Sequence, residues 1–164
     1  MNDRVILVTG AASGIGAACV RAMAGPGTAF LVHTRRNREG AEAVAGFARE
    51  RGARAETIFA DIADPATADA LVAAALARFG RLDVVVANAG FADRTPLLAQ
   101  SEAAFARSFD TILWAFLRLA RAASAQVAAA EHGRIIAISS FVAHVFRPAV
   151  VGFPATAAAK AGMG

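Results

Sequence analysis

The amino-acid sequence predicts an α/β fold, a doubly wound parallel sheet with helices on both faces. Short apolar runs alternate along the chain with longer segments that have helical periodicity. Each run is almost unbroken, as expected of a parallel strand that is buried on both of its faces. The first run, Val5–Val8, leads directly into the glycine-rich turn Thr9–Gly16, from which a helical pattern starts.

The composition suits one soluble domain. The chain has 164 residues, of which 57% are hydrophobic, so it can bury a sizeable core, and we expect a single domain over residues 1–164. The net charge of +4 includes no basic run interleaved with aromatic residues, so we expect no nucleic-acid partner. Cys19 is the only cysteine, which fits a reducing compartment. No leader and no membrane-spanning run is evident, so we expect a cytoplasmic protein without a membrane partner.

The turn after the first strand is the strongest functional signal. Its spacing is Thr-Gly-x-x-x-Gly-x-Gly, with Gly10, Gly14 and Gly16 as the glycines and Ser13 and Ile15 between them. Glycine lets the backbone turn sharply and approach a ligand closely, and a helix N-terminus offers unpaired N–H groups to a phosphate. An ordinary glycine-rich loop is the alternative, but the strand before it and the helix after it favour an anion-binding cradle.

The middle of the chain repeats the alternation of strand and helix. Gly25–Gly27 breaks the chain between the first helix and the second strand. Asp64 is expected to cap the third helix, with Pro65 at its first position. The expected elements of this part are strands at 29–32 and 55–60 and helices at 41–51 and 66–79.

The C-terminal part contains one long helix, expected at 101–130, between strands at 82–87 and 134–138. The long helix carries more apolar side chains than one buried face needs. It is either fully buried or a contact between subunits, and periodicity does not separate these alternatives. We expect a homo-oligomer that associates through the helix 101–130.

Polar residues follow the predicted strands directly. Besides the glycine turn they are Arg35, Arg36, Asp61, Asn88, Ser139 and Ser140. Any one of them could be a turn or cap residue. Together they mark the carboxyl edge of a parallel sheet, where such folds bind their ligands.

The two arginines after the second strand bear on the choice of cofactor. Arg35 and Arg36 lie about twenty residues past the glycine turn, where an acidic residue would hold the ribose 2′-hydroxyl of NAD. An arginine there suits a 2′-phosphate, because its fork of donors pairs with phosphate. The sequence therefore favours NADP over NAD; two solvated arginines in a loop are the alternative.

These motifs together resemble the short-chain dehydrogenase/reductase family along essentially the whole chain. They are the glycine turn, Asp61-Ile62, Asn88-Ala89-Gly90 and Ile138-Ser139-Ser140. The resemblance implies a Rossmann-type sheet and an NAD(P)-dependent oxidoreductase acting on a ketone or secondary alcohol, of the 3-oxoacyl reductase kind. It also implies cofactor contacts at the motif residues: Ser13 and Ile15 at the pyrophosphate, Asp61 and Ile62 at the adenine, and Asn88, Ala89 and Gly90 alongside the cofactor.

The family's catalytic serine, tyrosine and lysine are only partly matched. By resemblance Ser140 is the serine, which orients the carbonyl, and Lys160 is the lysine, which also holds the cofactor ribose. Thr156 stands four residues before Lys160, where the family has the tyrosine, and the chain contains no tyrosine. Counting from Ser140 by the family's usual spacing reaches Phe153 instead, which has no proton to give. An aliphatic hydroxyl is a far poorer acid than a phenol.

Two further residues complete the expected site. Thr111 aligns best with the asparagine that the family often carries on its long helix. His144, in the loop after Ser140, is a possible proton relay, although a lone loop histidine is more often only exposed. No metal site is expected.

The chain stops at Gly164, about one helical turn past Lys160. The family continues with further strands and helices, so we expect an incomplete domain, with C-terminal strands missing and the fifth strand as an exposed edge. Either the sequence is a fragment or a partner supplies the rest. The alternatives are an NADP-dependent reductase with a small-molecule substrate, a nucleotide-binding pseudoenzyme without turnover, and a subunit that serves mainly for association.

Overall fold

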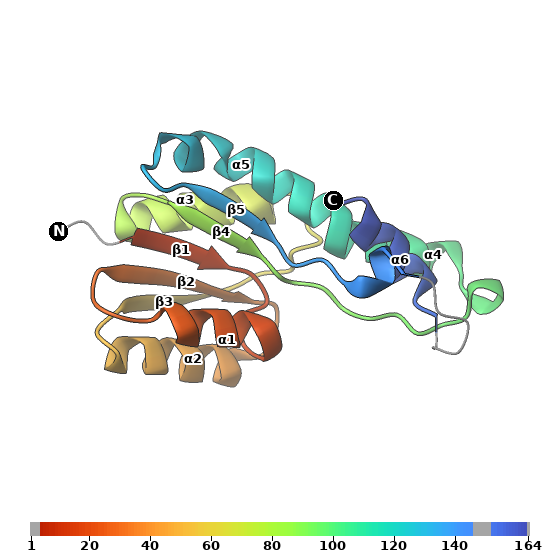
Figure 1. Ribbon diagram of the computed structural model, residues 1–164, viewed down its shortest axis with the longest axis horizontal. Helices are drawn as coiled ribbons and strands as arrows, with labels where there is room; N and C mark the ends of the chain where they lie inside the picture. The colour runs from red at the N-terminus through yellow and green to blue at the C-terminus, as the bar shows by residue number, and fades with distance from the viewer. Residues whose placement is uncertain (1–3, 146–151, 164) are drawn as a thin grey trace.

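The computed structural model describes residues 4–145 and 152–163 and shows one five-stranded parallel sheet (Figure 1). The strand order is β3-β2-β1-β4-β5, and every neighbouring pair is parallel. The strands are β1 (Arg4–Val8), β2 (Thr28–Thr34), β3 (Arg54–Phe59), β4 (Val84–Ala87) and β5 (Arg134–Ala137). The predicted α/β class and the parallel sheet are confirmed.

Helices cover both faces of this sheet. One face carries α1 (Gly14–Met23) and α2 (Arg38–Glu50), and the other carries α3 (Thr67–Phe79) and α5 (Ala115–Ala129) (Figure 1). The helices α4 (Glu102–Ser108) and α6 (Pro154–Ala161) lie beyond the carboxyl ends of the strands. No described helix is both long enough and apolar enough to cross a membrane.

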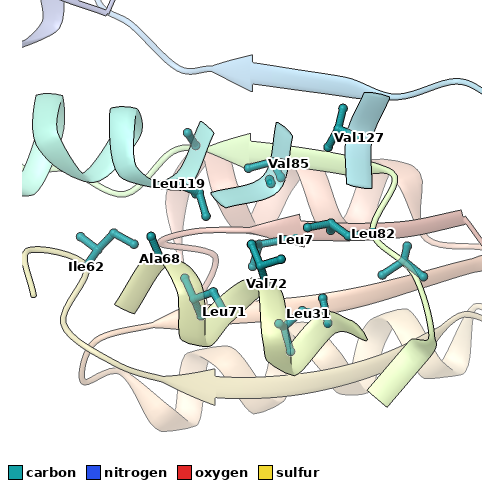
Figure 2. Close-up of a cluster of buried hydrophobic side chains, with 14 of the residues drawn as sticks. Leu7, Leu31, Ile62, Ala68, Leu71, Val72, Leu82, Val85, Leu119 and Val127 are labelled. Atoms are coloured by element: carbon teal, nitrogen blue, oxygen red, sulfur yellow. The ribbon is translucent and has the colours of Figure 1, made fainter. Parts of the chain in front are cut away.

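The strands are apolar throughout because both faces are buried. In β1, Leu7 packs toward α3 and α5 (Figure 2), while the adjacent Ile6 and Val8 pack toward α1 and α2. In β2, Leu31 and Phe30 divide between the two faces in the same way. Successive side chains of a strand point to opposite faces, so a strand covered twice needs apolar residues at every position.

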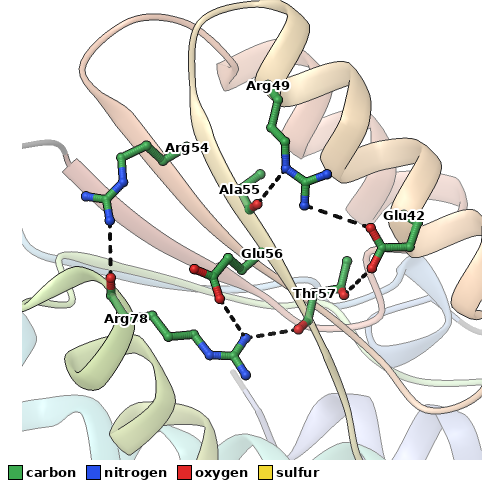
Figure 3. A network of polar contacts seen from close by, with 7 residues as sticks. All are labelled: Glu42, Arg49, Arg54, Ala55, Glu56, Thr57 and Arg78. Atoms are coloured by element: carbon green, nitrogen blue, oxygen red, sulfur yellow. Dashed lines mark hydrogen bonds and ion pairs between the residues drawn. The ribbon is translucent and has the colours of Figure 1, made fainter.

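The edge strand β3 is blocked by arginine side chains (Figure 3). Arg49 of α2 donates from Nε to the carbonyl of Ala55 at 2.9 Å, and Arg78 of α3 donates to the carbonyl of Thr57 at 3.0 Å. The two carbonyls belong to alternate residues of β3, and both point away from β2, toward the open edge of the sheet. A guanidinium on an edge carbonyl prevents pairing with another strand.

The opposite edge strand, β5, has no comparable cover among the described residues. Its side chains are all partly or fully exposed, and Ile136 is 42% exposed. Within residues 4–145 and 152–163 no further strand pairs with it. The structure therefore agrees with the expectation of an open edge at the fifth strand.

Two local expectations need correction. Asp64 does not cap α3: its Oδ1 accepts the N–H of Ala66, two residues on, and the helix begins at Thr67. The carboxylate thus closes a turn before the helix, as aspartate does in Asx-turns. The expected long helix is one helical run in three parts, because a π-helical segment, Phe109–Trp114, separates α4 from α5.

Candidate functional site

The glycine turn has the backbone geometry that an anion cradle needs. Gly10 and Gly14 have positive φ values of 63° and 55°, which favour glycine. A Cβ built on Gly16 would lie 2.6 Å from Nδ2 of Asn88, so no larger residue fits there. Ser13 precedes α1, but its side chain does not cap the helix, and the first turn holds no acidic residue. The first N–H groups of α1 therefore remain available to a ligand.

A polar network holds this turn against the end of β4. The Thr9 hydroxyl accepts the N–H groups of Asn88 and Ala89, both at 3.0 Å. The Asn88 side chain donates from Nδ2 to the carbonyls of Thr9 at 2.9 Å and Gly10 at 3.1 Å. Asn88 thus fixes the glycine turn, while Ala89 and Gly90 line the cleft beside it.

A cleft of about 430 Å³ runs along the carboxyl ends of the strands. This volume lies in the usual range for small-molecule and cofactor sites. The expected site residues that line it come from four separate loops and a helix, namely Gly10, Ser13, Arg35, Asp61, Ile62, Ala89, Gly90 and Thr111. Gly14, Ile15 and Gly16 directly follow Ser13 as the first turn of α1.

The two arginines after β2 have different surroundings. Nη1 of Arg35 lies 3.4 Å from Oδ2 of Asp61, and both side chains are about half exposed. Such an exposed ion pair contributes little to stability, so Arg35 can change partner at low cost. Arg36 is exposed, and its side chain has no hydrogen-bond or ion-pair partner among residues 4–145 and 152–163.

Several residues that line the cleft were not singled out from the sequence, namely Ala12, His33, Thr34, Asn37, Phe91 and Arg107. His33 is buried, and its Nε2 lies 3.1 Å from the carbonyl of Ala60, so Nε2 carries the proton in the neutral ring. Burial lowers the pKa of His33. A histidine directly after the apolar run 29–32 was a usable signal for this position.

Lys160 lies where α6 meets the end of β5. The residue is 8% exposed, and Nζ donates to the carbonyl of Ile138. A Cβ built on Gly90 would lie 3.7 Å from Nζ, so the ammonium group is next to the wall of the cleft. Burial lowers the pKa of Lys160.

The other expected catalytic residues lie around this point in different settings. Ser140 precedes the short helical turn Phe141–Ala143, and its carbonyl accepts the N–H of Ala143 at 3.1 Å. The neighbouring Ser139 is the serine whose hydroxyl donates to the carbonyl of Lys160, at 3.4 Å. Thr111 lies in the π-helical segment and faces the cleft, and His144 is exposed after the turn.

Thr156 shares the buried face of α6 with Lys160, as the four-residue spacing predicted. It is 5% exposed. Its hydroxyl accepts the N–H of Asp93 at 3.0 Å and donates to the carbonyl of Phe91 at 3.4 Å. Both bonds lead to the loop after Gly90, and Thr156 is not among the residues that line the cleft.

Comparison with known proteins places the whole arrangement in one family. A family model described as short chain dehydrogenase matches residues 4–164. A cis-4-hydroxycyclohexanecarboxylate dehydrogenase of Sinomonas cyclohexanicum is 40% identical over 144 residues, which cover 87% of this chain and 57% of the relative. A 3-oxoacyl-(acyl-carrier-protein) reductase of Escherichia coli is 31% identical over 162 residues, which cover 99% of this chain and 64% of the relative.

Solved structures agree with these relatives. A short chain dehydrogenase from Burkholderia cenocepacia in complex with NADP superposes with a TM-score of 0.89 at 30% identity. The alignment covers 98% of this chain and 64% of that chain. The present chain thus spans less than two thirds of the length of these proteins.

Proposed function

This chain belongs to the short-chain dehydrogenase family, and we propose that it binds NADP(H) along the cleft for hydride transfer with a ketone or secondary alcohol. One observation carries the proposal: the uncapped start of α1 opens into the same cleft as Arg35, Asp61 and Gly90. A dinucleotide could place its pyrophosphate at the start of α1, its adenosine at Arg35 and Asp61, and its nicotinamide at Gly90.

The residues present fit such a ligand. The N–H groups of the first turn of α1 would hold the pyrophosphate, at the positive end of the helix dipole. A side chain at Gly16 would occupy space beside Asn88, inside the cradle, and glycine leaves this space free. Asp61 and Ile62 would contact the adenine, and Arg35 and Arg36 would pair with a 2′-phosphate, which favours NADP over NAD.

At the reacting end we assign roles to Lys160, Ser140 and Thr111. The bound cofactor supplies or accepts the hydride. The Lys160 ammonium, beside Gly90, would hold the cofactor ribose, and Ser140 would orient a substrate oxygen. Thr111, which also lines the cleft, would stand where the family often has an asparagine. The relatives named above act on a hydroxycyclohexane ring and a 3-oxoacyl group, which supports a carbonyl or alcohol substrate.

A second candidate function is nucleotide binding without turnover. The chain has no tyrosine, and the hydroxyl of Thr156, at the tyrosine's place, is bonded to backbone groups of the loop at Phe91 and Asp93. Without an acid of suitable pKa, proton transfer to the substrate oxygen would be slow. In this second candidate function the chain binds the cofactor but does not catalyse hydride transfer.

Calorimetric titration with NADPH and NADH, followed by a ketone-reduction assay that monitors NADPH absorbance, tests both candidates. Tighter binding of NADPH than of NADH, together with turnover, supports the oxidoreductase. Binding without turnover supports the second candidate. Absence of binding for both nucleotides contradicts both.

We also propose that the chain associates through the outer face of the run from α4 to α5. Trp114 and Leu117 are 48% and 42% exposed there, beside Arg118 and Arg121. Exposed apolar groups rimmed by polar ones are typical of interaction sites. Light scattering should give a dimer or larger species for the wild type and a monomer for Trp114→Glu, and a wild-type monomer would contradict this association.

A further inference from the structure

Thr156 connects two segments that are distant in the sequence. It comes from α6, and its hydroxyl is bonded to the loop that follows Gly90, 63 and 65 residues earlier. It accepts one hydrogen bond, from the N–H of Asp93, and donates one, to the carbonyl of Phe91. A hydroxyl has one proton to donate, so this proton is already engaged within the protein.

The loop that Thr156 holds is a wall of the cleft. Phe91 and Arg107 both line the cleft, and the guanidinium of Arg107 lies over the Phe91 ring, 4.8 Å from its centroid. Arg107 also forms an ion pair with Asp93, with 3.8 Å between Nη2 and Oδ2. The carboxylate of Asp93 in turn accepts the N–H of Thr95 at 3.0 Å. A change at Thr156 therefore reaches Arg107 through two residues of the loop.

The same contact sets the position of Lys160. Thr156 and Lys160 lie one helical turn apart on the buried face of α6. The turn that contains Thr156 is fixed to the loop at Phe91 and Asp93. The turn that contains Lys160 is fixed by the hydrogen bond from its Nζ to the carbonyl of Ile138. With both turns held, the ammonium group stays next to Gly90.

We propose that Thr156 is a positioning residue: it ties α6 to the loop after Gly90 and thereby sets Lys160 and the cleft wall at the nicotinamide end. This inference rests on the proposed function, because it assigns that end of the cleft to the nicotinamide half of the cofactor. It replaces the expectation that Thr156 takes over the tyrosine's proton transfer. The adenosine end, at Asp61 and Ile62, does not depend on this contact.

The test compares Thr156→Val, which removes both hydrogen bonds at nearly the same volume, with Thr156→Ser, which keeps the hydroxyl. Thr57→Val is the matched control, because its hydroxyl bonds Glu42 at the edge strand β3 (Figure 3) and neither residue lines the cleft. The ligands are NADPH and 2′,5′-ADP, which lacks the nicotinamide half. Hydrogen exchange of the Asp93 amide gives a readout that needs no ligand.

In Thr156→Val we expect Asp93 exchange to be about tenfold faster, as for loss of one hydrogen bond, and NADPH to bind about tenfold more weakly. Affinity for 2′,5′-ADP should change less than about twofold, because the adenosine end is untouched. Thr156→Ser and Thr57→Val should match the wild type in both affinities.

Three results would overturn the inference. The first is unchanged Asp93 exchange in Thr156→Val, and the second is an equal loss of affinity for both nucleotides. The third is unchanged NADPH affinity with loss of turnover, which would make Thr156 a proton donor. If the wild type binds neither nucleotide, the proposed function fails, and the exchange of Asp93 alone decides whether Thr156 holds the loop.

Discussion

At the glycine-turn end of the cleft the start of α1 has no side-chain cap, whereas at the α6 end the polar side chains are bonded to backbone carbonyls. Lys160 donates to Ile138, Ser139 to Lys160 and Thr156 to Phe91. The first end is therefore ready to receive a ligand's charge. The second end holds its own loops together, and a ligand there must share groups that already have partners.

The two ends of the cleft are also built from different kinds of chain segment. The cradle is made of backbone groups within one short segment, so glycines at fixed positions are sufficient to form it. The other end is assembled from α6, the residues after β5 and the loop after Gly90, which come from different parts of the sequence and are joined by hydrogen bonds.

The largest effect is expected for Gly16→Ala. The new Cβ would lie 2.6 Å from Asn88 Nδ2 and 2.7 Å from the carbonyl oxygen of Gly10. Relief of this contact must displace the cradle, so we expect the free energy of unfolding to fall by about 1–3 kcal/mol, as for overpacked sites. NADPH binding should be lost, as measured by calorimetry.

Gly46→Ala is the control for that variant. Gly46 lies within α2, and a Cβ there meets no atom within 4 Å. The same added methyl group should raise the stability by about 0.5–1 kcal/mol, because alanine favours helix, and should leave NADPH binding intact. Equal behaviour of the two variants would contradict the account of the cradle.

An intermediate effect is expected when Arg35 and Arg36 are both replaced by alanine. Charge-assisted hydrogen bonds to phosphate contribute about 1.5–3 kcal/mol, so NADPH affinity should fall about 10- to 100-fold. NADH has no 2′-phosphate and should lose much less. The double variant Arg21→Ala/Arg121→Ala removes the same charge from helices α1 and α5 and should change neither affinity. Equal loss of both nucleotides in the first variant would refute the preference for NADP.

The smallest effect concerns His33 and pH. Burial lowers the pKa of His33 in the folded state, so below its ordinary value of 6.5 the unfolded chain binds more protons. The stability should therefore fall as the pH drops below about 6.5, by at most about 1.4 kcal/mol per pH unit. Thermal unfolding between pH 7.5 and 5 should show this slope in the wild type.

A His33→Asn variant should lose the slope, whereas His132→Asn, at an exposed histidine, should keep it. The carboxylate of Asp61 also acts on His33 and favours the protonated ring. Asp61 is itself beside Arg35. An unchanged slope in His33→Asn would show that another group causes the pH dependence.

The fold was largely predictable because its signals are local. Unbroken apolar runs and the break at Gly25–Gly27 placed the strands and helices near their observed positions. Two features were not predictable from pattern alone. Asp64 closes a turn instead of capping α3, since the same side chain suits both. The π-helical segment Phe109–Trp114 has an apolar pattern that does not separate it from an α-helix.

The candidate site was predictable where it is made of consecutive residues. The glycine turn and Asp61-Ile62 lie together in the cleft as expected from their places after the strands. The hydrogen-bond partners of Thr156 and Lys160 were not predictable. They lie far away in the sequence, and which residues meet α6 depends on how this helix packs. Arg107 was missed for the same reason.

We propose above that the start of α1 and the neighbouring loops bind NADP(H), nicotinamide adenine dinucleotide phosphate. The most direct test is to record backbone amide NMR spectra of the 15N-labelled chain during titration with NADP⁺. The largest shifts should fall on residues 10–16, with further shifts at 35–36, 61–62 and 88–90. If the amides of residues 10–16 stay unshifted at saturating NADP⁺, the cofactor does not bind at the start of α1.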